Sequence, residues 1–250
     1  EEVQRFSKEK QIVTGVPVTY SLIEHEVSGI VGNGAAVNGI LHHILVQIAA
    51  LHSYDEVKIV FLCDEANLKK FDYIRWVPHI WNNSFKRRFL ATNTEEVRDM
   101  SIFFLREMEK YRGERAIKIP HYVIVSTSKV LSDGCAFLAE LLRCPLECFS
   151  YLAVYDELKN LPKECTLILQ VNDAQGVMFN YREPGDGQIN FVPDEVSAKE
   201  AAESISNIAE YRLDLQSGKY ALPEMLTFLE MYKVGKYEHL NITSRWKNSN

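Results

Sequence analysis

Residues 27–52, VSGIVGNGAAVNGILHHILVQIAALH, predict a strand that passes through a glycine-rich turn into a long helix. The strand covers Val27 to Val31 and ends at the glycines. From Ala35 to His52, apolar residues recur at positions 37, 40, 41, 44, 45 and 48, which is the spacing of one helix face. Binding sites in open α/β sheets lie at the carboxyl ends of strands, so this unit directs attention to residues 29–39.

The rest of the chain repeats the alternation of strand and helix. Further buried strands are predicted at residues 56–63, 121–127, 148–154 and 166–171, with helices at 66–71, 94–111, 132–143, 197–215 and 222–232. Thr94 opens the second of these helices, and Ser197 with Glu200 forms a capping box. This alternation predicts an α/β fold of three layers, in which helices cover both faces of a mostly parallel sheet.

The ends of the predicted domain carry additional segments. Residues 1–20, where Pro17 excludes a central strand, and residues 176–192 are expected to add antiparallel pieces to the sheet. We therefore expect an edge segment or linker over residues 1–20, one α/β domain over 21–235, and a connector over 236–250. Because both chain ends are abrupt and polar, we expect the sequence to be a piece of a longer protein.

Composition excludes several classes of protein. The chain has 250 residues, with 28 Lys and Arg against 34 Asp and Glu, a net charge of −6. An acidic chain argues against non-specific nucleic-acid binding. The five cysteines show no CxxC spacing, which favours reduced thiols in a cytosolic protein. No run approaches the roughly 18–20 apolar residues of a membrane span, and the first residues are no signal peptide.

The glycine turn allows two interpretations. Gly34 and Gly39 have the GxxxxG spacing of a phosphate-binding loop, but Ile40 and Leu41 stand where that loop needs Lys and then Ser or Thr. A tight strand-to-helix turn is the favoured interpretation. The alternative is a remnant nucleotide or anion site formed by loop and helix amides. Its candidate residues are Gly32, Asn33, Gly34 and Gly39.

Asp64 is the remaining candidate for nucleotide chemistry. It follows the apolar strand that ends at Cys63, and such an ending binds magnesium in nucleoside triphosphatases. Asp64 could equally cap the short helix after it, and we favour that role. The next strand ends in Ser126 and Thr127 instead of carboxylates. No GxSxG elbow, metal-ligand cluster or catalytic residue is predicted, which disfavours an independent small-molecule enzyme.

A short basic run lies near aromatic residues. Lys86, Arg87 and Arg88 follow Phe85, and Trp81 and His79 precede them. Arginine and aromatic side chains are enriched at interfaces, so this loop is a candidate contact surface. Local core packing is the alternative for its aromatics, and a solvated loop for its charges.

Several stretches resemble one protein family. They are Val31-Gly32, Leu45 to His52, Pro78 to Trp81, Arg88 to Leu90, Leu226 to Tyr232 and Glu238 to Trp246. Together they resemble EssC/EccC proteins, the membrane-bound FtsK/SpoIIIE-type ATPases of type VII secretion, and the Gram-positive EssC type best. The matching part is the degenerate ATPase-like domain before the first ATPase module, and the family motif GxxGxGKS is missing here.

The resemblance implies a P-loop-ATPase-like or Rossmann-like fold and a non-catalytic role on the cytoplasmic face of the cell membrane. The module would couple motion of the ATPase modules to the membrane pore. Implied partners are neighbouring modules of the same polypeptide, membrane subunits of the system and small secreted helical substrates, with a hexameric full-length protein. ATP and Mg²⁺ would belong to the full-length protein, not to this chain. The tail with Trp246 would contact the next module. An unusual domain with weak or regulatory ATP binding is the alternative.

Overall fold

A computed structural model describes residues 15–32, 34–112, 120–172, 175–181 and 187–211. The chain divides into two units, Glu1–Glu210 and Tyr211–Asn250, and only the first is described in detail. The predicted helix at 222–232, the connector at 236–250 and Trp246 lie outside the described residues, as does Asn33.

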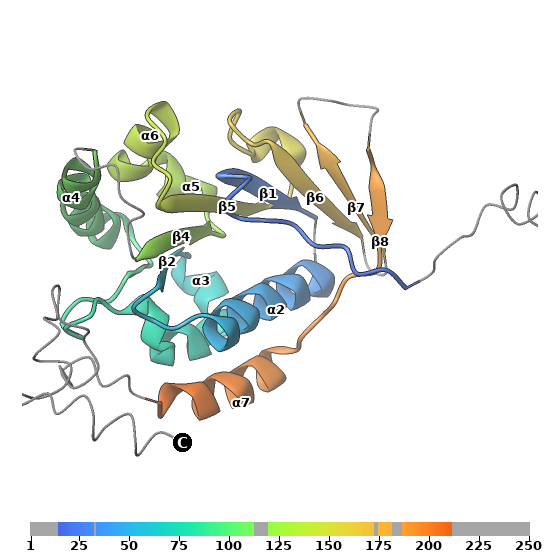
Figure 1. The fold of residues 1–250 in the computed structure, drawn as a ribbon, viewed down its shortest axis with the longest axis horizontal. Helices are drawn as coiled ribbons and strands as arrows, with labels where there is room; N and C mark the ends of the chain where they lie inside the picture. The colour runs from blue at the N-terminus through green and yellow to red at the C-terminus, as the bar shows by residue number, and fades with distance from the viewer. Residues whose placement is uncertain (1–14, 33, 113–119, 173–174, 182–186, 212–250) are drawn as a thin grey trace, which may run out of the picture. The chain divides into compact units, whose positions relative to one another are not determined.

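An eight-stranded mixed sheet forms the centre of this unit (Figure 1). Its strand order is β3-β2-β4-β5-β1-β6-β7-β8, and the pairs from β3 to β6 are parallel. β7 and β8 are added antiparallel to β6. The strands are β1 (Val27–Val31), β2 (Val57–Leu62), β3 (Leu90–Ala91), β4 (His121–Ser126), β5 (Phe149–Tyr155), β6 (Leu167–Asn172), β7 (Gln175–Asn180) and β8 (Ile189–Phe191). The predicted fold class is confirmed, and so are the antiparallel additions over 176–192.

Helices cover both faces of the sheet (Figure 1). One layer contains α4 (Thr94–Tyr111), α5 (Lys129–Asp133) and α6 (Ala136–Arg143). The other contains α2 (Ala35–Leu51), α3 (Glu65–Leu68) and α7 (Ala198–Ala209), and α7 packs on α2. Short 3₁₀ helices lie at Lys69–Trp76, Pro78–Ile80 and Leu158–Asn160. Among the described residues, no helix is both long enough and apolar enough to cross a membrane.

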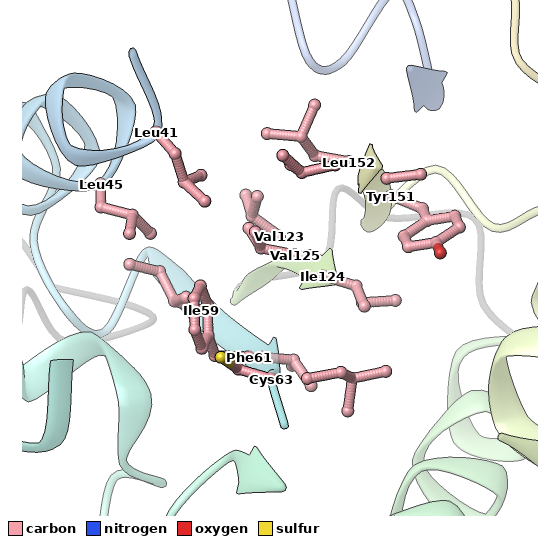
Figure 2. Packing of buried hydrophobic residues seen from close by; sticks show 14 of the residues in the cluster. Leu41, Leu45, Ile59, Phe61, Cys63, Val123, Ile124, Val125, Tyr151 and Leu152 are labelled. Atoms are coloured by element: carbon pink, nitrogen blue, oxygen red, sulfur yellow. The ribbon is translucent and has the colours of Figure 1, made fainter. Parts of the chain in front are cut away.

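Apolar side chains join α2 to the middle of the sheet (Figure 2). Leu41 and Leu45 of α2 point toward Ile59 of β2, beside which the parallel register places Val123 of β4. Tyr151 lies on the opposite face, in register with Ile124. β1, β4 and β5 are buried along nearly their whole length, as their largely apolar sequences predict.

Several element boundaries differ from prediction. Asn93, not Thr94, is the N-cap of α4, because its side chain accepts hydrogen bonds from the amides of Glu95 and Glu96. The helix predicted at 132–143 is two helices, α5 and α6. α5 begins earlier than predicted, at Lys129, and Gly134 and Cys135 separate it from α6. α7 has the predicted capping box but ends at Ala209 instead of Leu215. Of the N-terminal edge segment, the described residues 15–20 form no strand.

His42 is a buried titratable group in the layer that contains α2. Its side chain is 3% exposed, packs against the ring of Phe71 at 4.7 Å, and its Nδ1 lies 2.8 Å from the hydroxyl of Tyr73. Burial lowers the pKa of His42 to about 4. The imidazole is therefore neutral in the folded protein at pH 7.

We expect acid to destabilise the fold partly through His42. The unfolded chain takes up a proton near pH 6.5 and the folded chain only near pH 4, so the free energy of unfolding should fall as the pH drops through this window. The loss is roughly 2–3 kcal/mol. His42→Gln should show a shallower pH dependence in urea unfolding, although His79 and His121, whose pKa values are also lowered, keep part of it. Equal slopes for both proteins would contradict this assignment.

Candidate functional site

A small cavity opens where three parallel strands end at the N-terminus of α2. Its volume is about 120 Å³. Most ligand pockets for drug-sized molecules have volumes of roughly 300–1,000 Å³, so this cavity is small for a nucleotide. The cavity is lined by Gly32, Gly34, Val37, Asn38, Leu41, Asn67, Lys70, Phe71, Thr127, Val154, Tyr155 and Asp156.

The two glycines of the turn are needed for backbone conformation and packing. Gly32 has φ +150°, and a Cβ there would collide with the carbonyl oxygen of Val171 at the end of β6. Gly34, the N-cap of α2, has φ +85° and ψ −154°, a region that is almost restricted to glycine. A Cβ at Gly34 would meet no atom within 4 Å. This geometry is that of the tight turn favoured by the sequence.

Gly39 belongs to the helix and not to the turn. It lies in the second turn of α2, where backbone amides are engaged in helical hydrogen bonds. A Cβ at Gly39 would lie 2.9 Å from the Cβ of Glu195, and the carbonyl of Gly39 accepts a hydrogen bond from the amide of Val196. Gly39 therefore allows the segment before α7 to cross α2 closely. The GxxxxG spacing forms no loop here.

The polar groups of the cavity come from four parts of the chain: the start of α2, the helical segment with Asn67 and Lys70, Thr127 after β4, and Asp156 after β5. Gly34 offers no side chain to cap α2, so first-turn amides face this end of the helix, and Asn38 donates to the carbonyl of Gly34. The Nζ of Lys70 donates to Oδ1 of Asn67 at 3.0 Å. Asp156 adds a carboxylate at the end of β5. The sequence analysis missed Asn67, Lys70 and Asp156, because only the fold brings them to the glycine turn.

Asp64 lies beside the cavity through its contact with Asn67, which is a lining residue. It follows β2, which β4 and β5 separate from β1, and it is not among the lining residues of the cavity. Its Oδ1 accepts from the amide of Asn67 and its Oδ2 from the side-chain amide of Asn67, both at 2.9 Å. Asp64 is thus the N-cap of α3, the role that the sequence analysis favoured.

Hydroxyl groups occupy the ends of β4 and β5 behind the cavity. Ser132 donates to Ser126 at 2.6 Å, and Tyr155 donates to Ser132 at 2.9 Å. Tyr151 and Tyr155 share a hydrogen bond of 2.9 Å, and Ser126 donates to the carbonyl of Ser128. These groups satisfy one another, which is the usual arrangement of buried polar side chains. Ser126 and Thr127 supply no carboxylate at this edge.

No other catalytic group emerges from the described residues. Within them, no three His, Cys, Asp or Glu side chains form a group that could hold a metal ion. Burial raises the pKa of the Cys63 thiol to about 11 and also raises that of Cys135. Both thiols are therefore protonated at neutral pH and are poor nucleophiles.

The predicted contact loop divides into two parts. His79 is 2% exposed and contacts the carbonyl of His52 through Nε2 at 2.8 Å, and Phe85 packs on Tyr54 with ring centroids 5.6 Å apart. His79 is therefore buried, whereas Phe85 is half-buried and contacts Tyr54. Trp81 and Arg88 are half-buried and stack, with the Cζ atom of Arg88 4.4 Å from the ring centroid.

In sequence, the chain is similar to EccC and EssC proteins of type VII secretion systems. The chain is 28% identical over 257 residues to the ESX secretion system protein EccC of Geobacillus thermodenitrificans, and 25% identical over 224 residues to the type VII secretion system protein EssC of Staphylococcus aureus. These alignments cover 98% and 84% of the chain. The chain is homologous to the EssC/EccC type VII secretion ATPases. It spans only 17% and 15% of the lengths of these two relatives. No protein-family model matches it.

Solved structures of EssC and EccC share the fold. ATPases 2 and 3 of EssC from Geobacillus thermodenitrificans superpose with a TM-score of 0.55 at 9% identity, covering 76% of this chain and 44% of that one. The cytoplasmic domain of EccC from Thermomonospora curvata gives a TM-score of 0.50 at 16% identity, covering 75% and 28%. The α/β architecture around the cavity is thus the architecture of EssC/EccC ATPase domains.

Alanine substitutions at Gly32 and Gly34 should lower the free energy of unfolding by different amounts. Gly34→Ala should cost about 1–3 kcal/mol, because only the backbone region is unfavourable for alanine. Gly32→Ala should cost more, because strain is combined with a collision against the backbone of β6. Chemical denaturation of both variants measures the difference. Equal losses of stability would show that the collision with Val171 adds nothing to the backbone strain at Gly32.

The capping role of Asp64 predicts different stabilities for two substitutions at this position. Asp64→Ala should lose about 1 kcal/mol of stability, whereas Asp64→Asn should stay close to the parent, because asparagine is also a good N-cap. Both can be measured by urea unfolding with and without Mg²⁺. A stabilisation by Mg²⁺ that both substitutions abolish would instead identify Asp64 as a metal ligand.

Proposed function

We propose that this chain is a non-catalytic module of a type VII secretion ATPase, which acts through contacts with neighbouring ATPase modules and couples their motion to the membrane pore. The observation that carries the proposal is the burial of Ile40 and Leu41, which are 6% and 1% exposed in the core beneath the glycine turn. These are the positions of the Lys and the Ser or Thr in a phosphate-binding loop.

Phosphoryl transfer by a P-loop ATPase depends on polar and charged side chains beside the phosphates, and the positions after Gly39 in this domain are apolar. A P-loop ATPase uses a lysine on the outer phosphates, and a hydroxyl and a carboxylate on magnesium. Here the buried aliphatic side chains of Ile40 and Leu41 stand at the positions of the lysine and the hydroxyl. β4 ends at Ser126 and is followed by Thr127, so neither residue supplies the carboxylate. Lys70 is the cation that lines the cavity, but it comes from a different element and is hydrogen-bonded to Asn67. These features argue against ATP hydrolysis.

A coupling role is compatible with how the domain is built. The strands β1, β2, β4 and β5 of its sheet are almost fully buried and close-packed, and such interiors transmit displacement with little deformation. In this proposal the module sits on the cytoplasmic face of the membrane within a hexamer of the full-length protein. Its partners are the adjacent ATPase modules, membrane subunits and small helical secreted substrates.

A second candidate function is weak or regulatory nucleotide binding. It is favoured by the first-turn amides of α2, which lack a side-chain cap and share the cavity with Lys70. Anions are stabilised at helix N-termini. Asp156 and the small volume of the cavity oppose this candidate, because a carboxylate repels phosphate.

The two candidates predict different responses to ATP. The chain should not hydrolyse ATP with Mg²⁺, and its melting temperature should be unchanged at millimolar nucleotide. A ligand at 100-fold above its dissociation constant would add about 2.7 kcal/mol of stability, which is easily detected. Phosphate release and thermal shift provide the measurements.

Variants make the same experiment decisive. Lys70→Ala removes the cavity cation, and Lys199→Ala removes an exposed lysine on α7 as a matched control. A thermal shift by ATP that is lost in Lys70→Ala but kept in Lys199→Ala would favour nucleotide binding. Steady turnover by the purified chain would refute the non-catalytic proposal. Complementation of secretion by the full-length protein then tests the role in export.

A further inference from the structure

The segment between β2 and β3 carries two tryptophans and three arginines. We refer to Arg75, Trp76, Trp81 and Arg88 as the Arg/Trp surface. Trp76 is 68% exposed, which is unusual for so large an apolar side chain, and Arg75 next to it is also solvent-accessible. Trp81 and Arg88 occupy opposite positions of an isolated antiparallel bridge. Tryptophan and arginine are the side chains that most often dominate binding energy at protein interfaces.

Arg88 is held in place without an anionic partner. Its guanidinium stacks on Trp81, and Nε is buried without a hydrogen-bond partner. No ion pair of Arg88 occurs among the residues that the structure describes. A stacked guanidinium keeps its remaining N–H groups in a fixed plane, which suits bidentate binding of a carboxylate.

The surroundings of Arg88 are positive. The pKa of Arg88 is lowered by burial and then by the charge of Arg75, so these two arginines disfavour each other's charge. Arg75 is paired with Asp72 at 3.0 Å, but that pair is exposed and contributes little. Lys86 and Arg87 are exposed next to Arg88. The chain as a whole has a net charge of −6, so this cluster is a local exception.

We propose that the Arg/Trp surface binds an acidic protein segment, in which a carboxylate pairs with Arg88 and a neighbouring apolar side chain packs on Trp76. The carboxylate supplies the anionic partner that Arg88 does not have among the described residues, and the apolar contact covers the exposed indole of Trp76. This inference rests on the proposed function, because it specifies the chemistry of the partner through which the module acts.

A single-stranded nucleic acid is the competing ligand for arginine beside aromatic rings. Trp81 is half-buried with Arg88 stacked on its ring, so of the two indoles Trp76 alone offers an open face, whereas single-stranded nucleic acids stack successive bases on several rings, and this favours the protein segment. The same binding experiment separates these two ligands.

Peptide binding to the 250-residue chain tests the surface directly. The probe is a fluorescein-labelled peptide of alternating Glu-Asp-Leu triplets, and its matched control carries Gln-Asn-Leu triplets. Anisotropy should detect the acidic peptide alone, and added salt should weaken its binding. Trp76→Ala and Arg88→Gln should each weaken binding about tenfold. Arg143→Gln, which removes an exposed charge on α6, should leave binding unchanged.

Several results would overturn the inference. They are equal binding of both peptides, no binding of either, full binding by Trp76→Ala, or preferential binding of a thymidine oligonucleotide. If Arg88→Gln does not fold by circular dichroism, Arg75→Gln combined with Trp76→Ala replaces it, since both positions are exposed. Loss of peptide binding with unchanged secretion by the full-length protein would refute the proposed function while leaving the surface assignment intact.

Discussion

The close approach of the β1–α2 turn to β6 is the constraint on which the rest of the domain depends. Gly32 brings the chain against the carbonyl of Val171, and Gly34 then redirects it into α2 through a backbone region that other residues avoid. This path places Leu41 and Leu45 over the central strands. A bulkier turn would lift α2 from the sheet and separate Leu41 and Leu45 from Ile59.

The same constraint explains why the GxxxxG spacing of Gly34 and Gly39 does not form a phosphate-binding loop. In a phosphate-binding loop, the residues after the last glycine carry charge and a hydroxyl toward the ligand. In this chain the helix begins earlier, so Gly39 contacts the segment before α7, and Ile40 and Leu41 enter the core. Each of these residues therefore makes a packing contact inside the domain. At the neighbouring strand ends, Ser132 donates a hydrogen bond to Ser126 and accepts one from Tyr155.

Local sequence signals predicted most elements but not their junctions. The apolar strands β2 and β4 were recognisable because a strand buried on both faces must be continuously apolar. The cap of α4 was misplaced by one residue, because Asn93 and Thr94 are both good caps and only backbone geometry selects Asn93. The break at Gly134 was missed because the apolar pattern continues across it.

The sequence by itself determined the α/β class, the family resemblance and the presence of Ile40 and Leu41 where a phosphate-binding loop needs Lys and Ser or Thr, because these depend on residue type and spacing along the chain. Only the tertiary structure decided that Lys70, Asn67 and Asp156 share a cavity with the glycine turn, that Asp64 is a helix cap bound to Asn67 outside the cavity lining, and that Arg88 stacks on Trp81. Strand order creates these neighbours. Because the order depends on packing across the whole sheet, no local pattern encodes it.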